Sequence, residues 1–291
     1  MGFVINNNLA ANNSYRSLNA TQNDLSKSLE KLSTGLRINR AGDDAAGLAI
    51  SEGLKSQVTG SAQAARNAQD GISVIQTTEG ALTEVHSILQ RMRDLAVQGS
   101  NDTNNTASRD SIKAEGDSLG KELDRLTKST NFNGIQLLNG AASVGTTANA
   151  VAGEIEVQVG TGGVSGTDSI SFAVGDVPTA VGTLSSATTA AGFDVTDAAA
   201  AQGTIIAIDA AITAVSAQRS DLGAAQNRLE HTVKSLNVAG ENLQAAQSRI
   251  ADVDMAQEMV KFTKANILSQ AGTAMLAQAN QSSQGVLSLL R

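Results

Sequence analysis

Cysteine, proline and aromatic side chains are scarce in this chain of 291 residues. It contains no cysteine, no tryptophan, one proline (Pro178), one tyrosine and five phenylalanines. The absence of cysteine excludes disulfides and thiolate chemistry. Because aromatic residues supply much of the bulk of globular cores and small-molecule pockets, a chain with so few is a poor candidate for a ligand-binding enzyme. A single proline permits helices of many turns, since a proline inside a helix costs about 3 kcal/mol.

Charge and hydropathy argue against two classes of partner. The formal net charge of −7 provides no basic face for the phosphates of nucleic acid, so no nucleic-acid partner is expected. No apolar stretch approaches the 18 or more residues of a membrane span, so no membrane insertion is expected. The first residues, MGFVINNNLAANNSYRS, lack the basic and apolar regions of a secretory signal. A protein of this kind that leaves the cell is expected to use another route.

Catalytic, cofactor and metal sites are not predicted. The two histidines, His86 and His231, lie far apart in the sequence, and neither belongs to an HExxH pattern. The glycine string GTGGVSG (160–166) is not followed by the lysine of a phosphate loop, so it is interpreted as a turn. The chain is therefore expected to be no enzyme and to need no cofactor.

Apolar residues recur in alternating steps of three and four over most of the chain, which is typical of long helices that bury one stripe. Helices are predicted from about 45 to 98, around 112–126, and from about 196 to 254. The longest seam consists of Ile205, Ile208, Ile212, Val215, Leu222, Leu229, Val233, Leu236, Leu243 and Ile250. A second seam consists of Ile75, Leu82, Leu89 and Ala96, interleaved with Thr78, Val85 and Met92.

The middle of the chain has a different pattern. Residues 141–200 are rich in Gly, Ala, Ser and Thr and contain two alternating strings, GEIEVQVG (153–160) and DSISFAVG (168–175). Period-two alternation on both sides of a Gly/Ser/Thr turn predicts a β-hairpin. The predicted fold class is therefore mainly α, a long-helix coiled-coil rod with a small β-hairpin region.

Both ends of the chain read as amphipathic helices without local partners. The last segment is interpreted as one broad apolar stripe, and the ends are expected to pair with each other and to bury their remaining apolar surface against neighbouring subunits. The residues predicted to pack in this inner domain are Leu18, Leu25, Leu29, Leu32, Met259, Phe262, Ile267, Leu268 and Met275.

Several long strings resemble the signatures of bacterial flagellin, the subunit of the flagellar filament. In the N-terminal half these are STGLRINRAGDDAAGLAIS, ARNAQDGISVIQTTEGALTEV, LQRMRDLAVQGSN and FNGIQLLNG. In the C-terminal half they are LGAAQNRLEHTVKSLNVAGENLQAAQSRIADVDMAQEM and the terminal VLSLLR. The resemblance covers about residues 1–140 and 200–291. Extended matches in the same order are far more specific than one short motif.

The resemblance implies a domain organisation. Residues 1–34 and 255–291 would form an inner coiled-coil domain, and 35–44 a connecting spoke. Residues 45–176 and 200–254 would form a rod of three helices with the hairpin near 153–175, and 177–200 a short variable outer loop. The implied function is that of an extracellular structural subunit that polymerises with itself into the flagellar filament. The implied partners are the flagellar type III export gate and a chaperone, and the filament cap and hook–filament junction proteins.

The resemblance also implies two sets of contact residues. The spoke residues Arg37, Asn39, Arg40, Asp43 and Asp44 would touch adjacent subunits, although Asp43 or Asp44 alone reads as a helix cap. The string LQRMRDLAVQ resembles the flagellin segment bound by Toll-like receptor 5 of animal hosts, with Arg91, Leu95 and Glu115 at the matching positions. Leu95 follows Arg91 by four residues, so both are expected to project from one face. That face is also expected to contact the next subunit.

Two alternatives remain open from the sequence. The hook–filament junction protein of the same family shares the terminal domains and a similar length. A soluble signalling coiled coil would share the heptads, but the predicted hairpin at 153–175 and the unpaired amphipathic ends argue against it.

Overall fold

The structure is a computed structural model that describes residues 8–138, 153–164, 166–174, 177 and 192–289. It is mainly α-helical, as predicted. The helices are α1 (Leu9–Thr34), α2 (Ala45–Gly99), α3 (Thr106–Ser129), α5 (Ala198–Ala251) and α6 (Met255–Leu289). Two short antiparallel strand pairs complete the regular structure of the described residues.

The chain divides into two compact units. The terminal unit comprises residues 1–58 and 241–291, and the central unit comprises residues 59–240. The division therefore falls inside α2 and α5, and not at the ends of these helices, where the implied domain boundaries lie. The first turns of α2 and the last turns of α5 belong with α1 and α6.

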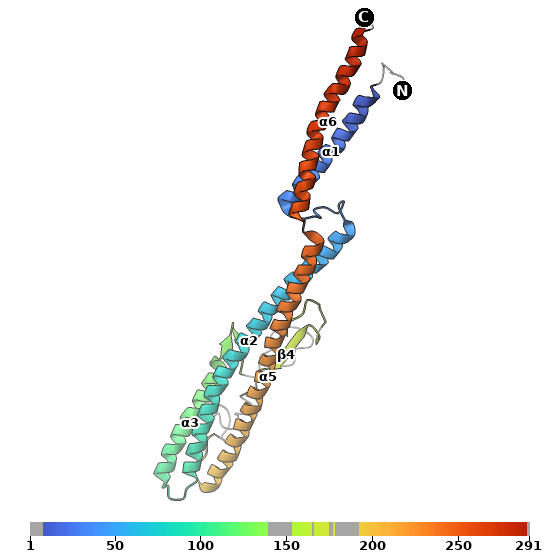
Figure 1. Cartoon of the computed structure of the whole chain (residues 1–291). Helices are drawn as coiled ribbons and strands as arrows, with labels where there is room; N and C mark the ends of the chain where they lie inside the picture. Colours follow the sequence, from blue (N-terminus) through green and yellow to red (C-terminus); the bar gives the residue numbers. More distant parts are fainter. Residues whose placement is uncertain (1–7, 139–152, 165, 175–176, 178–191, 290–291) are drawn as a thin grey trace. The chain divides into compact units, whose positions relative to one another are not determined.

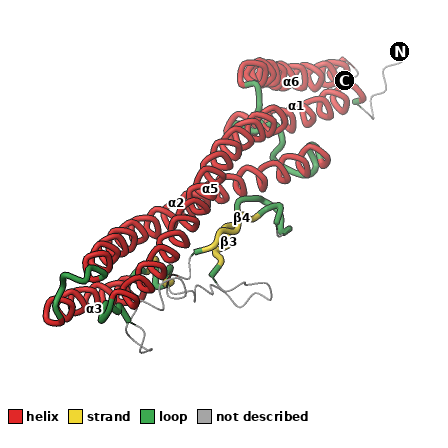
Figure 2. Tube along the Cα trace, turned by 90° about the horizontal axis from the view of Figure 1, so that it is seen from below, coloured by secondary structure: helices red, strands yellow, loops and turns green. Residues whose placement is uncertain are grey.

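In the terminal unit, α1 and α6 lie side by side (Figures 1 and 2) and run antiparallel. At one end the side-chain amide of Asn8 donates to the carbonyl of Ala279 at 3.0 Å. At the other end the hydroxyl of Ser28 donates to the carboxylate of Glu258 at 2.6 Å. Between them, a Cβ added at Gly272 would lie 3.2 Å from a methyl of Leu18. The missing side chain at Gly272 therefore lets the two helices approach closely.

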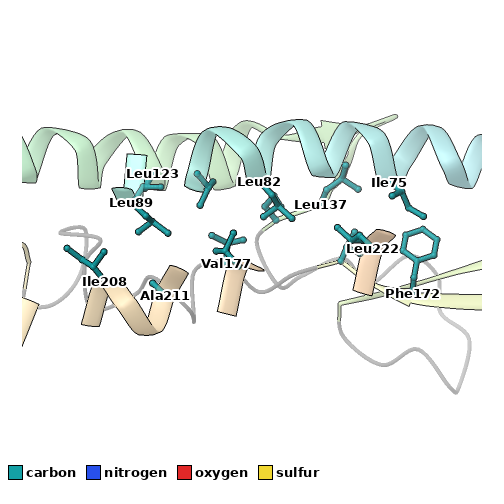
Figure 3. Close-up of a cluster of buried hydrophobic side chains, with 14 of the residues drawn as sticks. Ile75, Leu82, Leu89, Leu123, Leu137, Phe172, Val177, Ile208, Ala211 and Leu222 are labelled. Atoms are coloured by element: carbon teal, nitrogen blue, oxygen red, sulfur yellow. The ribbon is translucent and has the colours of Figure 1, made fainter. Parts of the chain in front are cut away.

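The central unit contains a continuous apolar core between α2, α3 and α5. Figure 3 shows side chains of α2 and α5 facing each other across this core. Two ion pairs join the helices at the surface, Arg93 with Asp209 at 2.6 Å and Arg219 with Glu79 at 3.4 Å. Because the higher-numbered residue of α2 pairs with the lower-numbered residue of α5, these helices are antiparallel. Fully buried core residues include Ile75, Leu82, Leu89, Leu123, Ile208 and Leu222.

The buried stripe of α5 differs in part from the predicted seam. Ile208, Val215, Leu222 and Leu229 are fully buried, as expected. At the intervening positions the structure buries small residues, and the predicted Ile205 and Ile212 are only half-buried. These small residues are Ala201, Thr204, Ala211 and Ala225. At alternate positions, the buried residue is therefore the one that precedes the predicted residue. Close packing between long helices favours small side chains at these positions.

Two strand pairs accompany the helices. The predicted hairpin is confirmed as β3 (Glu154–Gln158) paired antiparallel with β4 (Ser169–Ala173), drawn in yellow in Figure 2. A second, smaller pair, β1 (Asn131–Phe132) and β2 (Ile135–Gln136), was not predicted. Its turn places Asn133 at φ 50° and Gly134 at φ 81°, the left-handed geometry that an Asn-Gly hairpin turn requires. The predicted outer loop, 177–200, lies mostly outside the described residues.

Two helical glycines of the central unit occupy sites where another chain segment passes close by. A Cβ added at Gly116 of α3 would collide with the ring of Phe193, and one added at Gly71 of α2 would lie 3.0 Å from a methyl of Val157. Gly80 of α2, in contrast, has no other group within 4 Å of the position of a Cβ. Glycine is therefore required by packing at some helical positions and not at others.

One helix among the described residues, α5, is long and apolar enough to cross a membrane when only length and composition are considered. Its most apolar 18-residue window has a mean hydropathy of 1.5. The sequence-based statement that no apolar stretch approaches such a length is therefore wrong. The observation is weak evidence for a membrane span, because core helices meet the same criterion, and one side of α5 lines the core of the central unit.

Candidate functional site

Helix α6 carries apolar side chains around much of its circumference, and only part of this broad stripe faces α1. One side faces α1 and includes the half-buried Phe262 and Leu276 and the buried Ala265. Val260 precedes Phe262 by two residues, which is a rotation of about 200° around a helix. The outward stripe of α6 consists of Val260, Ile267, Leu268 and Met275, each 49–69% exposed. In the described part of the terminal unit, only the α1-facing side of α6 is covered.

An apolar surface groove lies on the outward stripe. It is lined by Met259, Val260, Thr263, Lys264, Ile267 and Leu268. These residues form two adjacent rows with steps of four positions, 259–263–267 and 260–264–268, so they make a continuous strip over about three turns of α6. A contiguous exposed apolar surface of this kind marks an interaction site.

The residues predicted to pack in the inner domain fall into two groups. Leu18, Leu25 and Leu32 of α1 and Phe262 of α6 are half-buried in the helix pair. The others are exposed, namely Leu29, Met259, Ile267, Leu268 and Met275. Heptad spacing correctly identified apolar helix surface, but only the first group contributes to packing within one chain.

A buried carboxylate lies where α1 ends beside the beginning of α6. The side chain of Glu258 is 5% exposed, accepts from Ser28 at 2.6 Å and pairs with Lys261 at 3.1 Å. The Ser28 hydroxyl and then the ammonium groups of Lys261 and Lys31 lower the pKa of Glu258 from its ordinary value, against the opposing effect of burial. Sequence periodicity did not identify Glu258, because the periodicity was derived from apolar residues alone.

The connector between α1 and α2, residues 35–44, is held by hydrogen bonds to the end of α5 and to the connector that follows it. Gly35 ends α1 in the left-handed conformation at φ 74°, and its carbonyl accepts from the amide of Val253 at 3.0 Å. Arg37 donates its backbone amide to Ala251 at 2.6 Å, and its guanidinium donates twice to the carbonyl of Ile250 at 3.2 and 2.8 Å. Arg37 thereby satisfies two of the carbonyls left free at the end of α5.

The remaining spoke residues make local contacts. Asp44 caps α2 by accepting from the amide of Gly47 at 2.8 Å. Asp43 accepts from the amides of Asn39 and Arg40, which lowers the pKa of its carboxyl. Arg40 pairs with Glu30 at 3.0 Å. The five predicted residues thus lie together in one short segment, and the capping interpretation holds for Asp44.

Of the three predicted receptor residues, two are exposed and one is buried. Arg91 of α2 and Glu115 of α3 form an ion pair at 2.6 Å, with side chains 56% and 47% exposed. Leu95 is 2% exposed and belongs to the core of the central unit. The expectation that Leu95 projects beside Arg91 is therefore wrong. Leu95 follows Met92 by three residues, so it continues the buried seam of α2, and this signal could have identified it.

Family models match most of the chain. The model of the bacterial flagellin N-terminal helical region matches residues 5–143, and that of the C-terminal helical region matches residues 205–290. The chain belongs to the flagellin family. Flagellins are structural proteins, so the chain is not an enzyme. Among the described residues, no group of three or more His, Cys, Asp or Glu side chains could hold a metal ion.

Curated relatives match this flagellin over almost its full length. A flagellin of Halalkalibacterium halodurans is 51% identical over 288 residues, covering 99% of this chain and 100% of the relative. A flagellin of Bacillus subtilis is 48% identical over 305 residues, covering 99% of each chain. A putative flagellar hook-associated protein of Vibrio parahaemolyticus shares the fold, with a TM-score of 0.55 over 72% of this chain and 100% of that one, at 15% identity.

Proposed function

We propose that this flagellin polymerises into the extracellular flagellar filament through the outward stripe of α6. The observation that carries the proposal is the apolar surface on two sides of α6, of which α1 covers one. A helix that is apolar all round is normally buried. Copies of the same chain are the partner that the family provides, and burial of apolar surface stabilises contacts by about 25 cal/mol per Å².

Two exposed valines allow a matched test. Val260 on the outward stripe is 69% exposed, and Val164 in the hairpin loop of the central unit is 62% exposed. Val260→Gln should reduce polymerisation of purified monomer, measured by sedimentation and electron microscopy, while leaving monomer helicity unchanged, because glutamine is a better helix former than valine. Val164→Gln makes the same chemical change and should polymerise normally. Equal behaviour of the two variants would contradict the role of the outward stripe.

The connector is proposed to act as a second subunit contact. In support of this role, Arg37, Asn39, Arg40 and Asp43 display charged or amide groups in one short segment of the terminal unit. Beside them lies a polar cleft of about 560 Å³ lined by charged residues of both signs. Arg37→Ala should impair polymerisation or alter filament shape, with little change in the circular dichroism of the monomer. Unaltered filaments from this variant would leave Arg37 as an intramolecular cap of α5 alone.

The other partners are proposed because the chain is a member of the flagellin family. The proposal includes delivery by the flagellar type III export gate with a chaperone, and assembly between the hook–filament junction proteins and the filament cap. Near 50% identity over the full chain to proteins named flagellin favours the filament subunit over the junction protein. A signalling coiled coil is favoured by none of these relatives.

Recognition of the monomer by Toll-like receptor 5 is proposed through Arg91 and Glu115. The supporting observation is an exposed ion pair between α2 and α3, at which a receptor carboxylate could replace Glu115. Arg91→Ala should lower the signal in a receptor reporter assay. Arg125, 64% exposed and paired with Glu122, offers a matched control, and Arg125→Ala should signal like the wild type. Equal signals from both variants would contradict the proposal.

A further inference from the structure

Because the chain has few easily oxidised side chains, a peroxide is expected to react mainly with methionine. The chain has no cysteine and no tryptophan, and it has five methionines. Met1 lies outside the described residues, and Met92 is fully buried in the core of the central unit. The other three, Met255, Met259 and Met275, all belong to α6.

The three methionines of α6 are open to solvent in the single chain. Met255 is 48% exposed, Met259 is 49% exposed and Met275 is 64% exposed. Met259 lines the apolar groove, together with Val260 and Leu268. Met275 follows Leu268 by seven residues, so it continues the outward stripe two turns further along. Met275 therefore belongs to the outward stripe, to which the proposed function assigns polymerisation, and Met259 lines the groove that lies on this stripe.

We propose that Met259 and Met275 are modification sites, at which oxidation to the sulfoxide by a peroxide stops the monomer from polymerising. In this reaction the O–O bond of the peroxide breaks and one oxygen forms a bond to the sulfur of methionine. The other oxygen leaves as water when the peroxide is hydrogen peroxide. The sulfur is oxidised by two electrons and the peroxide is reduced. The inference rests on the proposed function, since it concerns the regulation of the same surface.

The effect on assembly follows from the polarity of the product. A sulfoxide is a strong hydrogen-bond acceptor on a side chain that was apolar. The groove around Met259 offers it few donors, since its lining is mostly aliphatic apart from Thr263 and Lys264. Burial of such an acceptor against a second apolar surface is unfavourable. A methionine already covered by a neighbour should be shielded from peroxide, so the modification acts on free monomer and spares finished filament.

The test compares untreated and peroxide-treated monomer of the full chain. After brief exposure to hydrogen peroxide, peptide mapping by mass spectrometry should find sulfoxide at Met255, Met259 and Met275 and little at Met92. Polymerisation onto filament fragments should then require a monomer concentration about tenfold higher, because one unpaired buried acceptor is enough for that factor. Reduction with methionine sulfoxide reductases should restore polymerisation without any change of sequence.

Substitutions assign the effect to particular sulfurs. The double variant Met259→Leu with Met275→Leu should polymerise equally well before and after peroxide. Met255→Leu, which removes an equally exposed methionine outside the groove and the outward stripe, should stay as sensitive as the wild type. Oxidised wild type that polymerises like untreated protein, no recovery on reduction, or a double variant as sensitive as wild type would each overturn the inference. Untreated wild type that fails to polymerise would instead overturn the proposed function, and the inference with it.

Discussion

The two compact units bury their apolar residues to very different extents. Among the described residues of the central unit, α2, α3 and α5 enclose a continuous core that includes Leu82, Leu89 and Phe193, all fully buried. In the described part of the terminal unit, the buried apolar side chains are Ile38, Ala251 and Ala265. Large apolar side chains exposed there include Leu9, Tyr15, Leu29, Met259, Val260, Ile267, Leu268 and Met275. Helices with apolar residues therefore form one unit that encloses those residues within the single chain and another that leaves many of them exposed.

Limited proteolysis of the monomer should separate the two units most clearly. Isolated helices of the length of α1 are marginal in water, and in the described part of the terminal unit α1 packs mainly on α6. A protease should therefore trim both ends first and leave a fragment that contains about residues 59–240, identified by mass spectrometry. In the filament both ends should be protected. Equal resistance of the ends in monomer and filament would remove the distinction between the units.

Truncation of one leucine in each unit should give opposite results. Leu89→Ala removes a fully buried side chain from the central core and should lower the free energy of unfolding by about 2–5 kcal/mol in urea titrations. Leu268→Ala removes a side chain that is 49% exposed and should change the free energy of unfolding of the monomer by no more than about 0.5 kcal/mol. Polymerisation should be impaired by Leu268→Ala. A large loss of monomer stability in Leu268→Ala would show that this side chain packs within its own chain.

Helical glycines allow a finer comparison within the central unit. Gly80→Ala should raise the free energy of unfolding by up to about 1 kcal/mol, because alanine favours the helix and nothing lies within 4 Å of the new methyl group. Gly116→Ala should lower it, because its methyl group would collide with Phe193. Thermal unfolding of the two variants measures both changes. Stabilisation by Gly116→Ala would mean that the segment around Phe193 can move aside at little cost.

The smallest expected effect concerns the pH dependence of the terminal unit. Since the pKa of Glu258 is lowered in the folded chain, its contribution to stability is present above the unfolded value of 4.5 and is lost as pH falls through the folded pKa. The protection of the α6 amides against hydrogen exchange, relative to the intrinsic exchange rate at each pH, should therefore fall below about pH 4.5 in the wild type. Glu258→Gln should reduce that dependence and weaken the helix pair at neutral pH. An unchanged acid response in Glu258→Gln would assign the response to other carboxylates.

The sequence was sufficient to predict the long helices and the larger hairpin. In these elements the apolar residues recur with the helical period of 3.6 or the strand period of 2 over several residues. It was not sufficient for the buried seam of α5, where Ala211 is buried in preference to the neighbouring Ile212. Apolar periodicity identifies a stripe but not the partner helix, whose closeness decides between a small and a large side chain. The β1–β2 turn was recognisable from Asn133-Gly134, a pair that favours tight hairpins.

At the candidate site, the expectation from the sequence failed for one residue. The resemblance and the four-residue spacing from Arg91 placed Leu95 on an exposed face, but the structure has it in the core, three residues after the buried Met92. On α6 the sequence identified the apolar residues but not their division between two sides. That division depends on where α1 lies, and contacts between residues so distant in the chain are not encoded in local spacing.

The hydrogen bonds from Arg37 to the end of α5 have a consequence for the order of folding. Arg37 and Ile250, which they bring together, are 213 residues apart in the chain. Contacts between such distant residues form late, because the intervening chain must first be ordered or closed into a loop. During synthesis α1 has no partner until α6 has also been made. A chain cut short before residue 250 lacks the whole of α6, and with it both the hydrogen bonds at Arg37 and the outward stripe. The hydrogen bonds at Arg37 therefore form only after α5 has been made to its end.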